Sequence, residues 1–119
     1  MAIRRIKSYT GQTGFVYQYY YVGKRVALDP ARANSTEYVF DVTADRRTMF
    51  AVSIFVSREA LERWAEQHGR SLTETEQYAA AKMRLLQAFD EVRDLIQGTR
   101  QFTIDPEDIG ALLEQLDLG

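Results

Sequence analysis

The stretch FVYQYYYVGKR, residues Phe15–Arg25, holds five aromatic residues in its first seven positions and ends in a glycine followed by two bases. Aromatic and β-branched residues favour strands, so residues 15–22 form the segment with the strongest strand preference. Side chains alternate between the two faces of a strand. This alternation places Phe15, Tyr17, Tyr19 and Tyr21 opposite Val16, Gln18, Tyr20 and Val22. Because both faces carry apolar side chains, each must be covered by a helix, a loop or a second molecule.

The residues around this strand predict where the chain turns. Val22–Arg25 predicts a tight turn, because Gly23 can adopt a positive φ, and Arg25–Leu28 predicts the start of a return strand. Residues 3–8 predict a short first strand, and the two glycines of GQTG at 11–14 predict a flexible loop. Residues 29–35 form a further loop that begins with Asp-Pro.

Two more strands follow. Residues 36–43 alternate, with Tyr38, Phe40 and Val42 on one face and polar residues on the other. The polar run 44–47 predicts a hairpin, and residues 48–56 are apolar on both faces, which is typical of a central strand.

The second half of the chain has helical spacing and helix-end signals. Ser57 predicts the N-cap of a helix that ends before Gly69. Two overlapping capping boxes at 71–76 predict a long helix to about Gln97, with Gly98 as its stop. Its predicted apolar stripe is Ala79, Met83, Leu86, Phe89 and Ile96, with Leu85 and Val92 alongside. Asp105-Pro106 predicts a third, short helix that buries Ile109, Leu112, Leu113 and Leu116.

Strands followed by helices predict an α+β fold. We expect one domain over residues 1–119, with an antiparallel sheet of about four strands in the N-terminal half and two to three helices packed on one face.

Composition narrows the class of protein. Hydrophobic residues make up 45% and charged residues 27%, as in folded domains. No apolar run approaches the roughly 18 residues of a membrane helix, and the bases at the N-terminus precede no apolar signal segment. The chain has no cysteine, which excludes disulfides and thiolate chemistry. We expect a soluble cytoplasmic protein.

The sequence contains no catalytic signature. Its single histidine, His68, falls at a helix end, where a histidine commonly caps or packs. One histidine and no cysteine argue against a transition-metal site, and no nucleophile motif is present. We therefore expect no metal, no cofactor and no catalysis, and no catalytic residue is assigned.

The aromatic strand and the nearby bases suggest binding. The candidate surface comprises Tyr17, Tyr19, Tyr21, Lys24, Arg25, Arg46 and Arg47. Because tyrosine is enriched in interfaces, we expect a small interaction protein, a homodimer through this sheet face or the binder of another protein.

Two other functions remain open. Residues 1–56 carry a net +4 and residues 57–119 a net −6, so the basic half could bind nucleic acid. A pI of about 5.4 makes this less favoured. The second alternative is a small-ligand or enzymatic pocket lined by Tyr17, Tyr19, Tyr21 and Ser53.

Overall fold

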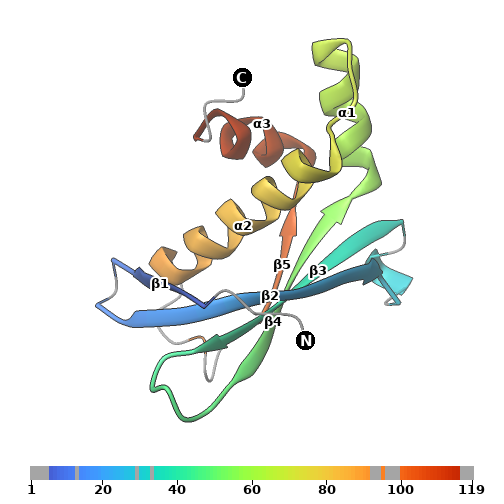
Figure 1. The fold of residues 1–119 in the computed structure, drawn as a ribbon. Helices are drawn as coiled ribbons and strands as arrows, with labels where there is room; N and C mark the ends of the chain where they lie inside the picture. The colour runs from blue at the N-terminus through green and yellow to red at the C-terminus, as the bar shows by residue number, and fades with distance from the viewer. Residues whose placement is uncertain are drawn as a thin grey trace.

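The computed structural model describes residues 6–12, 14–28, 30–32, 34–91, 95 and 100–115. The predicted α+β fold is confirmed: a sheet carries the helices on one of its two faces (Figure 1). In chain order the elements are β1 (Lys7–Thr10), β2 (Val16–Val26), the short 3-10 helix η1 (Pro30–Arg32), β3 (Ser35–Thr43), β4 (Phe50–Ser57), α1 (Arg58–His68), α2 (Glu74–Glu91), β5 (Gln101–Ile104) and α3 (Pro106–Gln115).

The sheet has five strands in the order β1-β2-β3-β4-β5. The first four form an antiparallel meander, and β5 pairs in parallel with β4. A parallel partner requires a crossover connection, which α1 and α2 supply. The fifth strand is absent from the sequence prediction, which placed only helices and their links after residue 57.

The predicted turn at Val22–Arg25 is wrong, because β2 runs through it without a break. Tyr21 lies opposite Phe40 and Gly23 opposite Val39, so β2 has one extra residue there and forms a β-bulge. Beyond the bulge, Lys24 pairs with Tyr38 on the helix side of the sheet. A glycine that permits a bulge has the same local signature as one that permits a turn, which explains the error.

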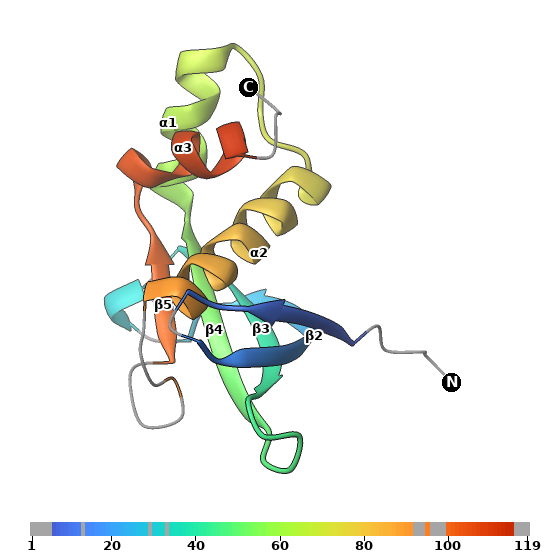
Figure 2. The same ribbon diagram turned by 90° about the vertical axis from the view of Figure 1, so that its left-hand side faces the viewer.

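The helix α2 covers the sheet (Figure 2). The ring of Phe89 in α2 stacks on the ring of Tyr17; the two ring centroids are 4.4 Å apart, and the two ring planes meet at 9°. The predicted apolar stripe is confirmed in part. Leu85 and Phe89 are buried, Met83 and Leu86 are partly buried against the core, and the other buried side chains are Ala80, Ala81 and Ala88. Val92, Ile96, Gln97 and Gly98 of that prediction lie outside the described residues.

The two other helices pack together beyond the ends of β4 and β5 (Figures 1 and 2). Trp64 of α1 and Ile109, Leu112 and Leu113 of α3 are buried in the same core as the sheet residues. The predicted buried stripe of the third helix is confirmed at these three positions, and Leu116 lies outside the described residues.

Caps confirm the predicted start and end of α1 and the start of α2, whereas α2 ends at Glu91, before the predicted end at about Gln97. Ser57 Oγ accepts a hydrogen bond from the Ala60 N–H at 3.1 Å, and Gly69 ends α1 with a φ of 71°. Of the two overlapping capping boxes, the structure uses Thr73 and Glu76, whose side chains each accept from the other's backbone N–H.

The N-terminal predictions hold in part. β1 begins later than predicted, at Lys7, and includes Tyr9 and Thr10; residues 3–5 lie outside the described part of the chain. The glycine loop after it is confirmed, with Gly14 at a φ of 96°.

Candidate functional site

The tyrosine face of β2 is covered by the chain itself. Tyr17 and Tyr19 are 1% and 5% exposed and pack against Phe89 of α2. Tyr21 is 36% exposed and meets the Tyr78 ring edge-on at 4.8 Å. Tyr17 and Tyr19 therefore belong to the core and offer no exposed surface to a partner.

A cluster of phenols lies where β2 and β3 meet the start of α2. Tyr38 is buried, its hydroxyl has no hydrogen-bond partner among the described residues, and burial raises its pKa to about 12. Lys24 lies over the Tyr38 ring at 6.0 Å and pairs with Glu74 of α2 at 3.4 Å. Lys24 thus faces the helix layer and already has an acidic partner.

Arg25 points to the opposite side, the sheet face without helices, which we call the outer face. Its Nε lies 2.8 Å from Glu37 Oε1, and Ser53 Oγ donates to Glu37 Oε2 at 2.6 Å. The hydrogen bond from Arg25 and then that from Ser53 lower the pKa of Glu37 against the opposing effect of burial. Arg32 of η1 lies over the Phe55 ring at 4.5 Å and covers this side of β4.

Arg46 and Arg47 occupy the β3–β4 hairpin, as predicted. Asp45 fixes this turn, because its carboxylate accepts from the N–H groups of Arg47 and Thr48 at 2.8 Å each. These two bonds lower the pKa of Asp45. Arg46 adopts a φ of 64°.

The predicted bases do not converge. Arg25 lies opposite Glu37 near the start of β3, whereas the hairpin follows Thr43 at its end. Six residue steps at about 3.3 Å each put roughly 20 Å between the two groups. The structure therefore divides the candidate surface into a buried tyrosine pair, a helix-side lysine and two separate basic groups.

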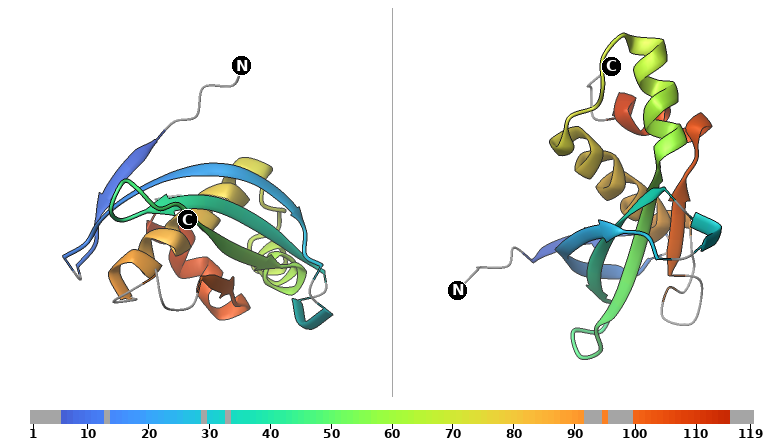
Figure 3. Two further views of the ribbon diagram at one scale, coloured as in Figure 1. Left: turned by 90° about the horizontal axis from the view of Figure 1, so that it is seen from below. Right: turned by 90° about the vertical axis from the view of Figure 1, so that its right-hand side faces the viewer.

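The outer face, which the helices leave uncovered (Figure 3), nevertheless carries exposed apolar side chains. Ile6, Val16, Val22 and Met49 are between 46% and 63% exposed. A hollow of about 180 Å³ near the hairpin is lined by Ile6, Gln18, Tyr19, Tyr20, Thr43, Arg46 and Met49. A second, of about 250 Å³, lies at the bulge and is lined by Val22, Gly23, Lys24, Arg25 and Val39.

A polar contact on the outer face connects β2 with β3. Tyr20, the tyrosine that alternation directs away from the core, donates its hydroxyl to Asp41 Oδ2 at 2.7 Å. Arg46 lines one hollow and Arg25 the other. Sequence reasoning assigned Val16 and Val22 to the face opposite Tyr17. It placed Ile6 and Met49 in predicted strands but did not connect them with this face, because the pairing of distant strands brings them together.

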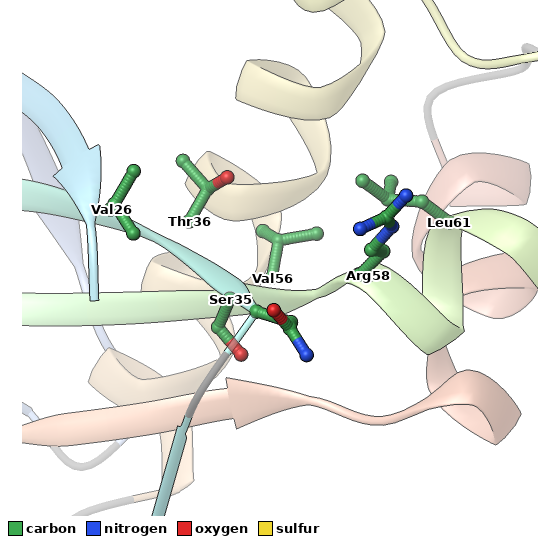
Figure 4. A pocket seen from close by; sticks show the side chains of 7 residues that line it. Val26, Ser35, Thr36, Val56, Arg58 and Leu61 are labelled. Carbon is green, nitrogen blue, oxygen red and sulfur yellow. The ribbon is translucent and has the colours of Figure 1, made fainter. Parts of the chain in front are cut away.

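A further hollow of about 240 Å³ lies where α1 leaves the sheet (Figure 4). Its lining residues are Val26, Asn34, Ser35, Thr36, Val56, Arg58 and Leu61. The guanidinium of Arg58 is hydrogen-bonded to Glu62 at 3.0 Å, one turn along α1. The wall is mostly apolar, and this hollow has no convergent set of polar groups.

The tyrosine-lined pocket does not form as a common site. Ser53 pairs with Val39, which lies on the outer face, whereas Tyr19 and Tyr21 pair with Val42 and Phe40 on the helix side. The four side chains proposed for that pocket therefore lie on two faces of the sheet.

Metal-binding and membrane features are not found in the described part of the chain. Its His, Asp and Glu residues form no group of three or more that could hold a metal ion. His68 instead stacks on Trp64 at 4.1 Å, with Nδ1 2.9 Å from the Trp64 carbonyl oxygen. None of the described helices is long and apolar enough to cross a membrane.

No protein-family model, curated protein or solved structure matches this chain.

Proposed function

We propose that this chain is a small non-enzymatic interaction protein of the cytoplasm that forms a homodimer through the outer face of its sheet. The observation that carries this proposal is the contrast between the two faces. The helices cover one face. On the other, exposed Ile6 and Met49 line one hollow, exposed Val22 lines a second, and Val16 is exposed on the same strand as Val22. Contiguous exposed apolar surface is typical of protein interaction sites.

The charges of this face favour a second copy as the occupant. A two-fold interface must be self-complementary, because the same patch meets itself. Each end of β3 carries a base and an acid: Arg25 pairs with Glu37 at one end, and Asp45 precedes Arg46 in the hairpin at the other. An antiparallel arrangement of two copies can therefore place each base near an acid of the partner.

The test is the oligomeric state of the intact chain. Light scattering coupled to size exclusion, over a concentration series, should give a dimer for the wild type. Val16→Glu and Met49→Glu place a charge in the interface and should shift the mass toward the monomer. Leu28→Glu is the matched control, because Leu28 is 82% exposed and lies beyond the end of β2; it should remain dimeric.

Two results would overturn the proposal. One is a monomeric wild type at every concentration. The other is a dimer that Val16→Glu and Met49→Glu leave as stable as Leu28→Glu does. Salt-sensitive binding of single-stranded oligonucleotides by the monomer, weakened by Arg46→Ala and Arg47→Ala, would favour the nucleic-acid alternative instead.

A further inference from the structure

The hollow of about 180 Å³ beside the β3–β4 hairpin, which we call the hairpin hollow, combines apolar walls with polar groups. Gln18 of β2 lies opposite Thr43 of β3, and both side chains point to the outer face because they alternate with the buried Tyr19. Ile6, just before β1, and Met49, just before β4, add exposed apolar side chains. The lining residues are Ile6, Gln18, Tyr19, Tyr20, Thr43, Arg46 and Met49.

The hydroxyl groups that face this hollow are already hydrogen-bonded within the chain. The Tyr20 hydroxyl donates to Asp41 at 2.7 Å. Thr43 Oγ1 donates to Asp45 Oδ1 at 3.2 Å and accepts from the Arg46 N–H at 3.0 Å. Tyr20 and Thr43 therefore act as walls, and the polar contacts with a ligand fall to the other polar side chains of the lining.

The guanidinium of Arg46 is such a group. Its side chain forms no ion pair and no hydrogen bond with another described residue, and the same holds for the side-chain amide of Gln18. The backbone beneath Arg46 is fixed, because Asp45 accepts from the N–H groups of Arg47 and Thr48. Arg46 itself has a φ of 64°, which is uncommon outside glycine. The hairpin thus sets the direction in which an uncompensated cation leaves the chain.

The charges of the hairpin favour one kind of anion. Residues 41–49 hold two acids and two bases and carry no net charge: Asp41, Asp45, Arg46 and Arg47. A surface without excess positive charge does not attract a polyanion such as a nucleic acid. A planar guanidinium instead matches a single carboxylate, whose two oxygens accept two parallel hydrogen bonds. The anion that fits is therefore a monocarboxylate.

The size and walls of the hollow define the rest of the ligand. A cavity of about 150 Å³ holds one benzene ring, so a volume of about 180 Å³ has room for a single ring. We propose that the hairpin hollow binds a small aromatic carboxylate, with its carboxylate on Arg46 and its ring against Ile6 and Met49. The site shares the outer face with the dimer proposed above but does not depend on it, because each group named here belongs to one chain.

Benzoate is the probe for this site. Nuclear magnetic resonance follows the Arg46 Nε–H and the Met49 methyl group, one on each side of the ligand, during a titration at constant ionic strength. Benzoate should shift both signals in a saturable manner, with a dissociation constant of about 1 mM for so small a ligand. Benzyl alcohol lacks the charge and acetate lacks the ring, so each should bind at least about fivefold more weakly. Inorganic phosphate should shift neither signal more than sodium chloride does.

Two hairpin variants test the role of the guanidinium. Arg46→Gln should weaken benzoate binding about five- to tenfold and leave benzyl alcohol unaffected, because only the charged ligand uses this donor. Arg47→Gln is the matched control, since Arg47 is an exposed neighbour outside the lining, and it should bind benzoate as the wild type does. The proposal is overturned if both variants lose the same affinity, or if acetate binds as tightly as benzoate.

The oligomeric state of the same samples separates this site from the dimer. The titration is made on the wild type and on Val16→Glu, whose substitution lies outside the lining. Saturable benzoate binding by a monomeric wild type would refute the dimer and support the site. A dimeric wild type, with no response to benzoate in either protein, would refute the site and leave the dimer standing.

Discussion

At the scale of single residues, Glu37 is a buried acid whose carboxylate is bound by two side chains. It is 6% exposed on the outer face and is held by Arg25 and Ser53. The hydrogen bond from Arg25 and then that from Ser53 lower the pKa of Glu37 below its ordinary value of 4.5, although burial alone would raise it. The folded state therefore holds a proton on Glu37 less readily than the unfolded state, and this difference links Glu37 to stability.

The contribution of Glu37 should be present at neutral pH and lost in acid. Because its folded pKa is depressed, the stabilisation is complete above about pH 4.5 and disappears as the pH falls through the folded value. Glu37→Gln should cost about 1–2 kcal/mol near pH 7, at the low end for a charged hydrogen bond because Arg25 is 61% exposed. Urea unfolding of both proteins at several pH values measures the difference, which should shrink below pH 4.5. A constant difference at all pH values would contradict the assignment.

The side-chain directions of β2 were predictable as far as the bulge. Alternation assigned Tyr17, Tyr19 and Tyr21 to one face and Tyr20 to the other, and the structure agrees. Which face the helices would cover was not predictable, because both faces of β2 are apolar. That choice depends on the handedness of the crossover through α1 and α2, which strand periodicity does not encode.

At the scale of elements, two glycines occupy positions with different backbone conformations. Gly69 has a φ of 71° and ends α1, whereas Gly23 lies in β2 at the bulge without a positive φ. A β-carbon added at either position meets no atom within 4 Å. The two positions therefore differ in backbone strain alone.

Alanine at these glycines should have opposite effects. Gly69→Ala should lose about 1–2 kcal/mol of stability, because alanine is strained at positive φ. Gly23→Ala should leave stability unchanged or raise it by up to about 1 kcal/mol, since it lowers the entropy of the unfolded chain. Thermal or urea unfolding of both variants checks this. A large loss at Gly23 would favour the turn that the sequence alone suggested.

The helices were more predictable than the edge of the sheet. Ser57, Thr73 and Glu76 carry local cap signals, because a cap satisfies backbone groups within a few residues. In contrast, β5 is only four residues long and takes its partner from β4, about fifty positions earlier. Such a short strand has little local signal, and its stability comes from the parallel pairing and the burial of Phe102 and Ile104.

At the scale of the whole molecule, one hydrophobic core connects two layers: the sheet with α2, and the pair of helices α1 and α3. The sheet and α2 form the larger part, and α1 with α3 packs beyond the strand ends (Figure 2). The buried side chains of both parts form one continuous cluster. Trp64, the only tryptophan, reports on α1, while the buried tyrosines report on the sheet.

The two layers should therefore unfold together. Tryptophan fluorescence and the near-ultraviolet circular dichroism of the tyrosines, followed through the same urea titration, should give coincident transitions. A Trp64 transition at lower urea than the tyrosine transition would mean that α1 and α3 separate first. Mutating Leu112 to alanine, which removes a buried contact of α3, should lower both midpoints equally.

The candidate surface was the least predictable feature. The bases Arg25 and Arg46 were singled out from the sequence, but their separation along β3 follows from β2 continuing through Gly23. Ile6 and Met49 each fell within a predicted strand, but only the fold brings the two together beside Tyr20. A surface is assembled from segments far apart in the chain, and local patterns do not determine it.

The late arrival of β5 has a consequence for protein synthesis. When β4 leaves the ribosome, one of its edges is unpaired, because β5, the strand that pairs with this edge, has not yet been translated. The strand carries the apolar residues Val52, Ile54 and Val56. At about 5–20 residues per second, the roughly 45 residues before β5 take several seconds to translate. During that interval a nascent chain exposes an apolar strand edge of the kind that pairs with other chains. Codon choice and chaperone supply over residues 58–100 should therefore influence the yield of the protein more than its final stability does.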